Sequence, residues 1–134
     1  MRSLTIKQPW ADAITHGTKR VENRSWTTRY RGPVLIHAGA TYDPMGRFII
    51  TDREALAAWP DTRRAVIATA ELVDIHAASA GGCCAPWSEP NAYHWALTQV
   101  RTLSEPVPAT GRLRLWTPTT DLLRAVHNQL EPDQ

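Results

Sequence analysis

Residues 7–32 carry the sequence KQPWADAITHGTKRVENRSWTTRYRG, and this stretch predicts a short helix followed by an extended segment. Pro9 suits the first turn of a helix, and Gly17 is a natural helix stop. Between them, apolar residues recur at helical spacing, at Trp10, Ala13 and Ile14. After Gly17, residues 19–26 alternate as in a strand.

Outside this stretch, the chain supplies further strands and a closing helix. Residues 42–59 predict one kinked helix or two short ones, starting at Asp43-Pro44, with an interrupted apolar stripe at Phe48, Ile49, Leu56 and Trp59. Residues 76–91 predict a loop, and residues 119–130 predict an amphipathic helix capped by Thr119 or Thr120. Strand patterns cover residues 3–7, 33–38, 64–75, 93–103 and 112–116. Strands without regular helix alternation favour an α+β fold, mainly β, built as a small barrel with flanking helices.

The length and the rarity of special motifs limit the class of protein. A chain of 134 residues has an ordinary size for one domain, so we expect residues 1–134 to form a single unit. No run is apolar enough for a membrane span or a signal peptide, which predicts a cytoplasmic protein without a membrane partner. The adjacent Cys83 and Cys84 are expected to be reduced thiols. Without a phosphate loop, a nucleophile elbow or histidines at metal spacing, we expect no metal and no other cofactor.

The net charge of +2 hides an uneven distribution. Residues 1–31 hold seven Arg or Lys side chains and only two acidic ones, whereas acidic residues outnumber basic ones in the rest of the chain. Both lysines, Lys7 and Lys19, lie in this basic first quarter. An anionic partner is therefore plausible there, with a chance cluster of solvated side chains as the alternative.

Several short motifs carry a family resemblance. The first quarter contains Gln8-Pro9-Trp10-Ala11, Gly17-x-Lys19, Glu22-Asn23-Arg24-x-Trp26 and Tyr30-Arg31-Gly32, and later come Ile36-His37-Ala38, Tyr93-His94-Trp95, Leu103-x-x-Pro106 and Gly111-x-Leu113-x-Leu115-Trp116. Over nearly the whole chain they resemble the ASCH domain family, which belongs to the PUA-like barrels. The resemblance implies a PUA-like β-barrel with a cleft between the first helix and the sheet, in which relatives hold RNA, DNA or a modified nucleoside.

The residue types agree with such a cleft. Tryptophan faces can stack on bases, and basic side chains can meet phosphate. Asn23 can recognise a base edge or satisfy backbone groups, and each tryptophan can instead pack in the core, as we expect for Trp59 and Trp116. His37, in an apolar strand, is expected to be a core histidine. Tyr93 and His94 follow the predicted loop, and we expect one of them to face the cleft. The candidate ligand-binding residues are Lys7, Gln8, Trp10, Asn23, Arg24, Trp26, Arg31, Tyr93 and His94.

Lys19 and Glu22 are the candidate catalytic pair. Strand alternation would place them on opposite faces, so they meet only if a turn or bulge follows Gly17. The resemblance implies that members which deacetylate a cytidine use such a lysine to activate a threonine three positions later. Position 22 is Glu22 here, so that nucleophile is absent and Glu22 would have to act as a general base on water. The alternative is a structural ion pair.

Three functions follow from these patterns. The leading hypothesis is a domain that binds RNA or a nucleotide in the basic cleft, with DNA as a possible alternative ligand. The second is a hydrolase, either an amidohydrolase for a nucleoside such as N4-acetylcytidine or a metal-independent ribonuclease, using Lys19 and Glu22. The third is a module that recruits a partner protein through residues 48–59, which predicts an exposed apolar patch there and a closed or unoccupied cleft.

Overall fold

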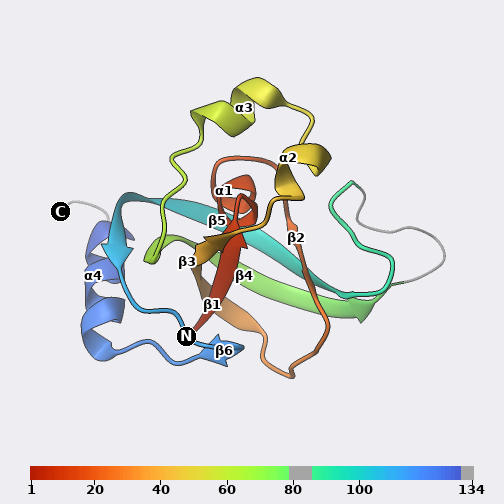
Figure 1. The fold of residues 1–134 in the computed structure, drawn as a ribbon. Coiled ribbons are helices and arrows are strands. Elements are labelled where there is room, and N and C mark those ends of the chain that lie inside the picture. The colour runs from red at the N-terminus through yellow and green to blue at the C-terminus, as the bar shows by residue number, and fades with distance from the viewer. Residues whose placement is uncertain (79–85, 131–134) are drawn as a thin grey trace.

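The structure, a computed structural model, describes residues 1–78 and 86–130 and consists of one curled sheet with four helices around it (Figure 1). Cys83 and Cys84 lie outside the described residues. In chain order the elements are β1 (Arg2–Gln8), α1 (Trp10–Thr15), β2 (Val21–Arg24), β3 (Gly32–Tyr42), α2 (Gly46–Ile49), α3 (Arg53–Ala58), β4 (Ala65–Ala77), β5 (Tyr93–Pro108), β6 (Leu115–Trp116) and α4 (Thr120–Leu130).

The six strands lie in the order β2-β5-β4-β3-β1-β6. Only the pair β1 and β3 is parallel, and the other neighbouring pairs are antiparallel. The sheet curls into a half-barrel, with α1 inside the curve, α2 and α3 above one end, and α4 beside β5 and β6 (Figure 1). This confirms the expected mainly-β, PUA-like architecture with flanking helices.

Most predicted elements are confirmed, although two strands are shorter than expected. Residues 19–26 contribute only Val21–Arg24 to β2, because the turn after Gly17 carries Lys19 outside the sheet. Residues 112–116 contribute only Leu115–Trp116, which pair with β1. β4, by contrast, is longer than predicted. It continues through His76 and Ala77, which belong to the predicted loop, because both residues pair with β5.

The predicted helix pair over residues 42–59 is confirmed as two short helices, but its apolar stripe is not buried as one face. Phe48 is 74% exposed and Ile49 is 47% exposed, and Met45 beside them is also exposed. Asp43 lies in the turn before α2, where its Oδ1 accepts a hydrogen bond from Met45 N at 3.0 Å, and α2 begins later, at Gly46. Within residues 48–59, Phe48 and Ile49 are thus exposed, whereas Leu56 and Trp59 are half-buried.

The core is formed largely by the apolar runs of β3 and β4, in which six consecutive residues are buried in each strand, together with apolar residues of α1 and α4. One cluster fills the curve of the sheet around Trp95 and Ile14, and a second lies under α4 around Leu35 and Val126. Trp116 packs in this second cluster, as predicted. Thr119 is the cap of α4, since its Oγ1 accepts from Leu122 N at 3.1 Å.

Trp59 packs against the end of α1, where Gly17 leaves room for it. A Cβ at Gly17 would lie 2.7 Å from Ala13 O and 3.0 Å from the Trp59 ring. Only glycine allows this approach, and the chain turns there toward Lys19.

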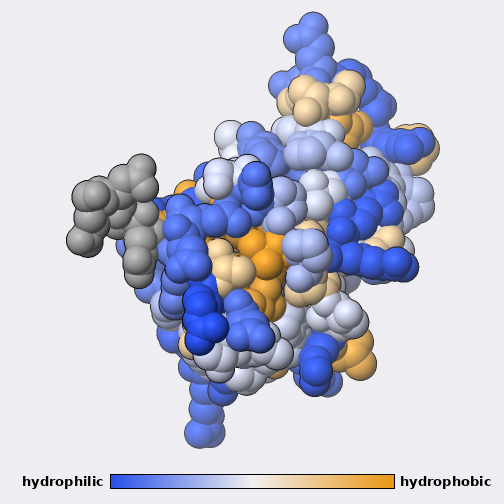
Figure 2. Space-filling view, turned by 90° about the vertical axis from the view of Figure 1, so that its left-hand side faces the viewer, coloured by the Kyte–Doolittle hydropathy of each residue, from blue (hydrophilic) through white to orange (hydrophobic). Residues whose placement is uncertain are grey.

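The side of the molecule that carries α4 in Figure 1 is mostly hydrophilic, with hydrophobic residues gathered near its centre (Figure 2). Among the described residues, no helix has the length and apolar character that crossing a bilayer requires. Within residues 1–78 and 86–130, no three His, Cys, Asp or Glu side chains come together in a way that could hold a metal ion.

Candidate functional site

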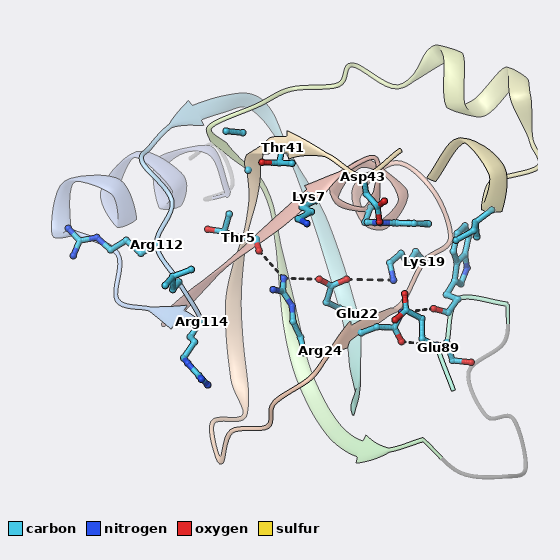
Figure 3. A pocket seen from close by; sticks show the side chains of 18 of the residues that line it. Thr5, Lys7, Lys19, Glu22, Arg24, Thr41, Asp43, Glu89, Arg112 and Arg114 are labelled. Carbon is cyan, nitrogen blue, oxygen red and sulfur yellow. Dashed lines mark hydrogen bonds and ion pairs between the residues drawn. The ribbon is translucent and has the colours of Figure 1, made fainter. Parts of the chain in front are cut away.

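A cavity of about 490 Å³ lies at the open side of the half-barrel. Its wall combines side chains from β1, α1, β2 and β3 with two segments from later in the chain, residues 86–89 and 112–114 (Figure 3). Five basic residues, three acidic residues and two tryptophans line it, namely Lys7, Lys19, Arg24, Arg112, Arg114, Glu22, Asp43, Glu89, Trp10 and Trp87. The volume is within the range of roughly 300–1,000 Å³ typical of small-ligand sites.

Lys19 and Glu22 meet in the cavity wall. The backbone turns after Gly17, with Lys19 N donating to Ala13 O at 3.1 Å, so Lys19 precedes the strand and strand alternation does not apply to it. Its Nζ lies 3.7 Å from Glu22 Oε1 and donates to the carbonyl of Val21. The turn that this pairing required is therefore present.

Arg24 extends this pair into a row of three charges. Its Nη2 lies 2.8 Å from Glu22 Oε2 and donates to Thr5 O at 2.8 Å. Glu22 consequently stands between two cations, with Lys19 on one oxygen and Arg24 on the other (Figure 3). Lys19 and Glu22 are almost fully buried, whereas the Arg24 side chain is 23% exposed.

Burial lowers the pKa of Lys19 from its ordinary value of 10.5, and the nearby Glu22 carboxylate opposes this effect. The ammonium also lies 5.6 Å from the centre of the Trp10 ring, a cation–π distance. Trp10 is fixed in turn by its Nε1, which donates to Asp43 Oδ2 at 2.9 Å. The wall thus presents a fixed aromatic ring beside a buried amine.

Asn23 attaches a distant segment to this wall. Its Nδ2 donates to Trp87 O at 2.8 Å, and its Oδ1 accepts from Glu89 N at 2.9 Å. Because both ends of the amide are used, Asn23 positions Trp87 and Glu89 at the cavity. The alternative in which Asn23 satisfies backbone groups is the one found.

His37 contacts the chain just before the other late segment of the wall, residues 112–114. Its Nε2 donates to Ala109 O at 2.7 Å, so Nδ1 is the acceptor for the Thr5 hydroxyl at 3.1 Å. Trp116 Nε1 donates to the same hydroxyl at 3.1 Å. Burial lowers the pKa of His37, which agrees with a neutral imidazole. The prediction of a hydrogen-bonded core histidine is confirmed.

The structure brings together six of the predicted site residues and leaves five outside the cavity wall. Inside are Lys7, Trp10, Lys19, Glu22, Asn23 and Arg24. Outside are Gln8, Trp26, Arg31, Tyr93 and His94.

Gln8 and Trp26 serve the framework of the site. Gln8 is fully buried, where its Nε2 donates to Thr62 O at 2.7 Å and its Oε1 accepts from Asp12 N at 3.0 Å. The Trp26 ring packs edge-on against Trp95 with 4.7 Å between centres. Both therefore belong to the packed framework and not to the cavity lining.

The other three lie farther from the wall. Arg31 is exposed and donates to the carbonyls of Thr28 and Tyr30. Tyr93 packs against the core, and His94 is buried with its Nε2 2.7 Å from Glu89 O. Neither Tyr93 nor His94 faces the cavity, contrary to the expectation that one of them would.

Sequence reasoning missed several wall residues that lie outside residues 7–32. They are Thr5, Thr41, Asp43, Trp87, Glu89, Arg112, Leu113 and Arg114. Arg112 and Arg114 could have been recognised from the sequence as candidate site residues. They alternate with a leucine within the predicted strand over residues 112–116. Trp87 and Glu89 gave no such signal, because their position depends on the hydrogen bonds from Asn23.

A family model for the ASCH domain matches residues 4–107. The chain belongs to the ASCH domain family. The matched range covers most of β1 and β5, all of β2 to β4 and all eleven predicted site residues, but it ends before Arg112. The resemblance seen in the short motifs is confirmed.

Curated relatives match only a short part of this ASCH domain. The human activating signal cointegrator 1 is 51% identical over 37 residues, which is 28% of this chain and 6% of that protein. The mouse protein of the same name is 51% identical over 35 residues, which is 26% of this chain and 6% of that protein. The chain thus spans a small fraction of the length of these relatives.

Among solved structures, the crystal structure of a mutant ZmASCH protein from Zymomonas mobilis is similar over 99% of this chain and 85% of that chain, with a TM-score of 0.53 and 18% identity. At this identity the likeness shows the fold alone. It agrees with the half-barrel described above and gives no residue roles.

Proposed function

We propose that this ASCH domain binds RNA or a nucleotide in the cavity between α1 and the sheet. The observation that carries the proposal is the convergence of a fixed aromatic ring, Trp10, with the cations Lys7 and Arg24 on one cavity of about 490 Å³. A base needs an apolar face to stack on, and its phosphate needs a positive charge within reach. This wall offers both.

An unpaired donor in the wall supports the same proposal. Nε of Arg24 is buried and has no hydrogen-bond partner among the described residues. Buried polar groups in native proteins are almost always paired with protein, water or ligand. A ligand phosphate or carbonyl oxygen at the cavity edge would also face the guanidinium that Glu22 and Thr5 O hold in place.

The experiment is a titration of the protein with a short single-stranded RNA at about 50 mM and about 200 mM salt, with polyglutamate as the acidic control polymer. We expect the RNA to bind more tightly than the control and its affinity to fall as salt rises. Binding no tighter than to polyglutamate, or insensitive to salt, would contradict the proposal.

A second candidate function is hydrolysis of a modified nucleoside or of RNA, and the approach of Lys19 to Glu22 at 3.7 Å in the same wall favours it. Burial lowers the pKa of Lys19, which raises the fraction of neutral amine available to accept a proton. In such a reaction Glu22 or Lys19 would take a proton from water while the water oxygen forms a bond to the acyl carbon or phosphorus. The acyl C–N bond to the cytidine, or the P–O bond to the leaving ribose, then breaks, and the leaving nitrogen or oxygen takes up that proton.

The deciding assay incubates the protein with N4-acetylcytidine and, separately, with labelled RNA. Turnover that Lys19→Ala abolishes would support hydrolysis at this pair. Unchanged turnover in Lys19→Ala would remove the pair from the mechanism, and no turnover with either substrate would leave binding as the function.

A further inference from the structure

The segment Arg112-Leu113-Arg114, called the 112–114 tip below, projects beside the cavity between Gly111 and β6. Leu113 is 91% exposed, more than any other large hydrophobic residue in the described part of the chain. An isolated exposed leucine is ordinary on protein surfaces, so exposure alone indicates nothing. Here, however, the leucine stands between two exposed arginines at the wall of a cavity.

The tip is held firmly at both of its ends. On one side, His37 Nε2 donates to Ala109 O at 2.7 Å, and Gly111 packs so closely that a Cβ there would lie 2.8 Å from Thr5 Oγ1. On the other side, Leu115 pairs with Leu4 of β1. The three residues between these anchors therefore project from a rigid base.

Arg114 has an unusual backbone conformation that fixes its direction. Its φ is +59°, in the left-handed region that non-glycine residues rarely occupy. Its guanidinium lies 5.0 Å from the centre of the Trp26 ring, a cation–π contact. Strained residues persist where the surrounding structure holds them, and they concentrate at ligand-contacting sites.

A second exposed apolar side chain also borders the cavity. Ile49 at the end of α2 lines the cavity and is 47% exposed. Both residues line the cavity, so a free nucleotide would cover the sides of Leu113 and Ile49 that face it and leave their outer sides in water. A longer strand that leaves the cavity would cover them.

We propose that the cavity holds one nucleotide of a longer single-stranded nucleic acid and that the 112–114 tip binds the nucleotides next to it. Leu113 packs against the neighbouring base, as apolar side chains do in other nucleic-acid complexes, and Arg112 and Arg114 pair with the flanking phosphates. This inference rests on the proposed function, and it adds the ligand class, a strand in place of a free nucleotide. The tip lies outside the residues that the family model matches, 4–107.

The test compares the four ribonucleoside 5′-monophosphates with a mixed-sequence RNA of about eight nucleotides, a length comparable to known single-strand sites. Binding is measured for the wild type, for Leu113→Ser and for the double variant Arg112→Gln/Arg114→Gln. Val73→Ser is the matched apolar control, since Val73 is 50% exposed and lies away from the cavity. Arg124→Gln is the charge control, since the Arg124 side chain is 67% exposed on α4.

We expect the wild type to bind the RNA at least about tenfold more tightly than any monophosphate. Leu113→Ser should weaken RNA binding by roughly fivefold or more and weaken monophosphate binding clearly less, because a single nucleotide covers only the side of the leucine that faces the cavity, whereas the neighbouring base of a strand covers the rest. The double arginine variant should reduce the slope of log affinity against log salt by about 1.4, since each of the two lost phosphate contacts on a single strand contributes about 0.7. Both control variants should match the wild type.

Equal affinity for RNA and monophosphate would overturn the inference while leaving the proposed function intact. A loss in Leu113→Ser that is the same for both ligands, no loss at all, or equal binding of polyglutamate would also overturn it. If neither RNA nor any monophosphate binds the wild type, the proposed function fails together with the inference. The leucine is so exposed that its replacement leaves the fold undisturbed, which circular dichroism would verify.

Discussion

The charged residues that line the cavity fall into two groups, which are called the buried wall and the exposed rim from here on. In the wall, Lys19, Glu22 and Arg24 form a row in which each charge contacts the next. On the rim, Lys7, Arg112 and Arg114 are exposed to solvent. Both groups are basic overall, yet among these described residues only those of the wall form ion pairs within the fold.

This difference separates residues that couple folding to binding from residues that affect binding alone. A buried ion pair loses much free energy when one partner is removed, because the other charge remains unpaired in a poorly solvated place. An exposed charge contributes little to stability and acts mainly through long-range attraction, which salt screens. Substitutions in the wall and on the rim should therefore give different combinations of effects.

The largest effect should come from Glu22→Ala. Lys19 is only 2% exposed, and without the Glu22 carboxylate its charge would lack its counterion. We expect the free energy of unfolding to fall by about 3 kcal/mol, as is usual when a buried pair loses one member. Urea unfolding followed by tryptophan fluorescence measures this change.

Lys19→Met is the matched control for Glu22→Ala. It removes the buried charge, keeps a side chain of similar length, and leaves Glu22 paired with Arg24 at 2.8 Å. Its cost should be about 1 kcal/mol or less. If Lys19→Met were as destabilising as Glu22→Ala, the idea that an unpaired buried charge causes the loss would be wrong.

A smaller effect is expected from Asn23→Ala, which releases the segment around Trp87 and Glu89 from β2. Two hydrogen bonds are lost, at 2.8 and 2.9 Å, with an expected cost of about 1–2 kcal/mol. Hydrogen exchange at the Glu89 amide should become faster, because that N–H donates to Asn23 Oδ1. Asn23→Asp keeps this acceptor and should preserve the protection, whereas equal exchange rates in both variants would argue against the proposed role.

These residues also show which features a sequence can reveal. The strands β1, β3 and β4 and the helix α4 were predictable, because alternation and amphipathic spacing are local patterns. Contact between Lys19 and Glu22 could be predicted only on the condition that a turn follows Gly17. The placement of Trp87 depends on the pairing of β2 with β5, in which Asn23 lies opposite His94, and no local pattern encodes that register.

Lys19 in the buried wall should also make the stability of the protein depend on pH. Burial lowers the pKa of Lys19 in the folded state below 10.5, so the unfolded chain binds its proton more tightly. The cost of burying the charged amine is fully present below the lowered pKa. It disappears as the pH rises through that pKa toward 10.5, so this residue makes stability increase with pH.

Urea unfolding midpoints at several pH values up to 10.5 measure this dependence. The same measurement on Lys19→Met gives the contribution of all other titrating groups, which is then subtracted. The difference in stability between wild type and Lys19→Met should shift in favour of the wild type as the pH rises. A difference that is independent of pH, or that shifts the other way, would contradict a lowered pKa.

The smallest effect on stability should come from the rim. Lys7→Gln should change the free energy of unfolding by less than about 0.5 kcal/mol, since Lys7 is exposed. Its effect should appear in the affinity for RNA, with a salt slope reduced by about 0.7 if one phosphate contact is lost. A loss of stability comparable to that of Asn23→Ala would contradict this expectation, because it would mean that Lys7 contributes to folding as the buried wall residues do.

The central claim is that the ligand occupies the cavity between α1 and the sheet. Its most direct test is an NMR titration of the isotope-labelled protein with short single-stranded RNA, with amide chemical shifts mapped along the chain. We predict the largest changes at Thr5, Lys7, Asn23, Arg24 and Thr41, which line the cavity. Changes concentrated instead on α4, or around the second hollow lined by Tyr42, Arg47 and Arg53, would contradict the account.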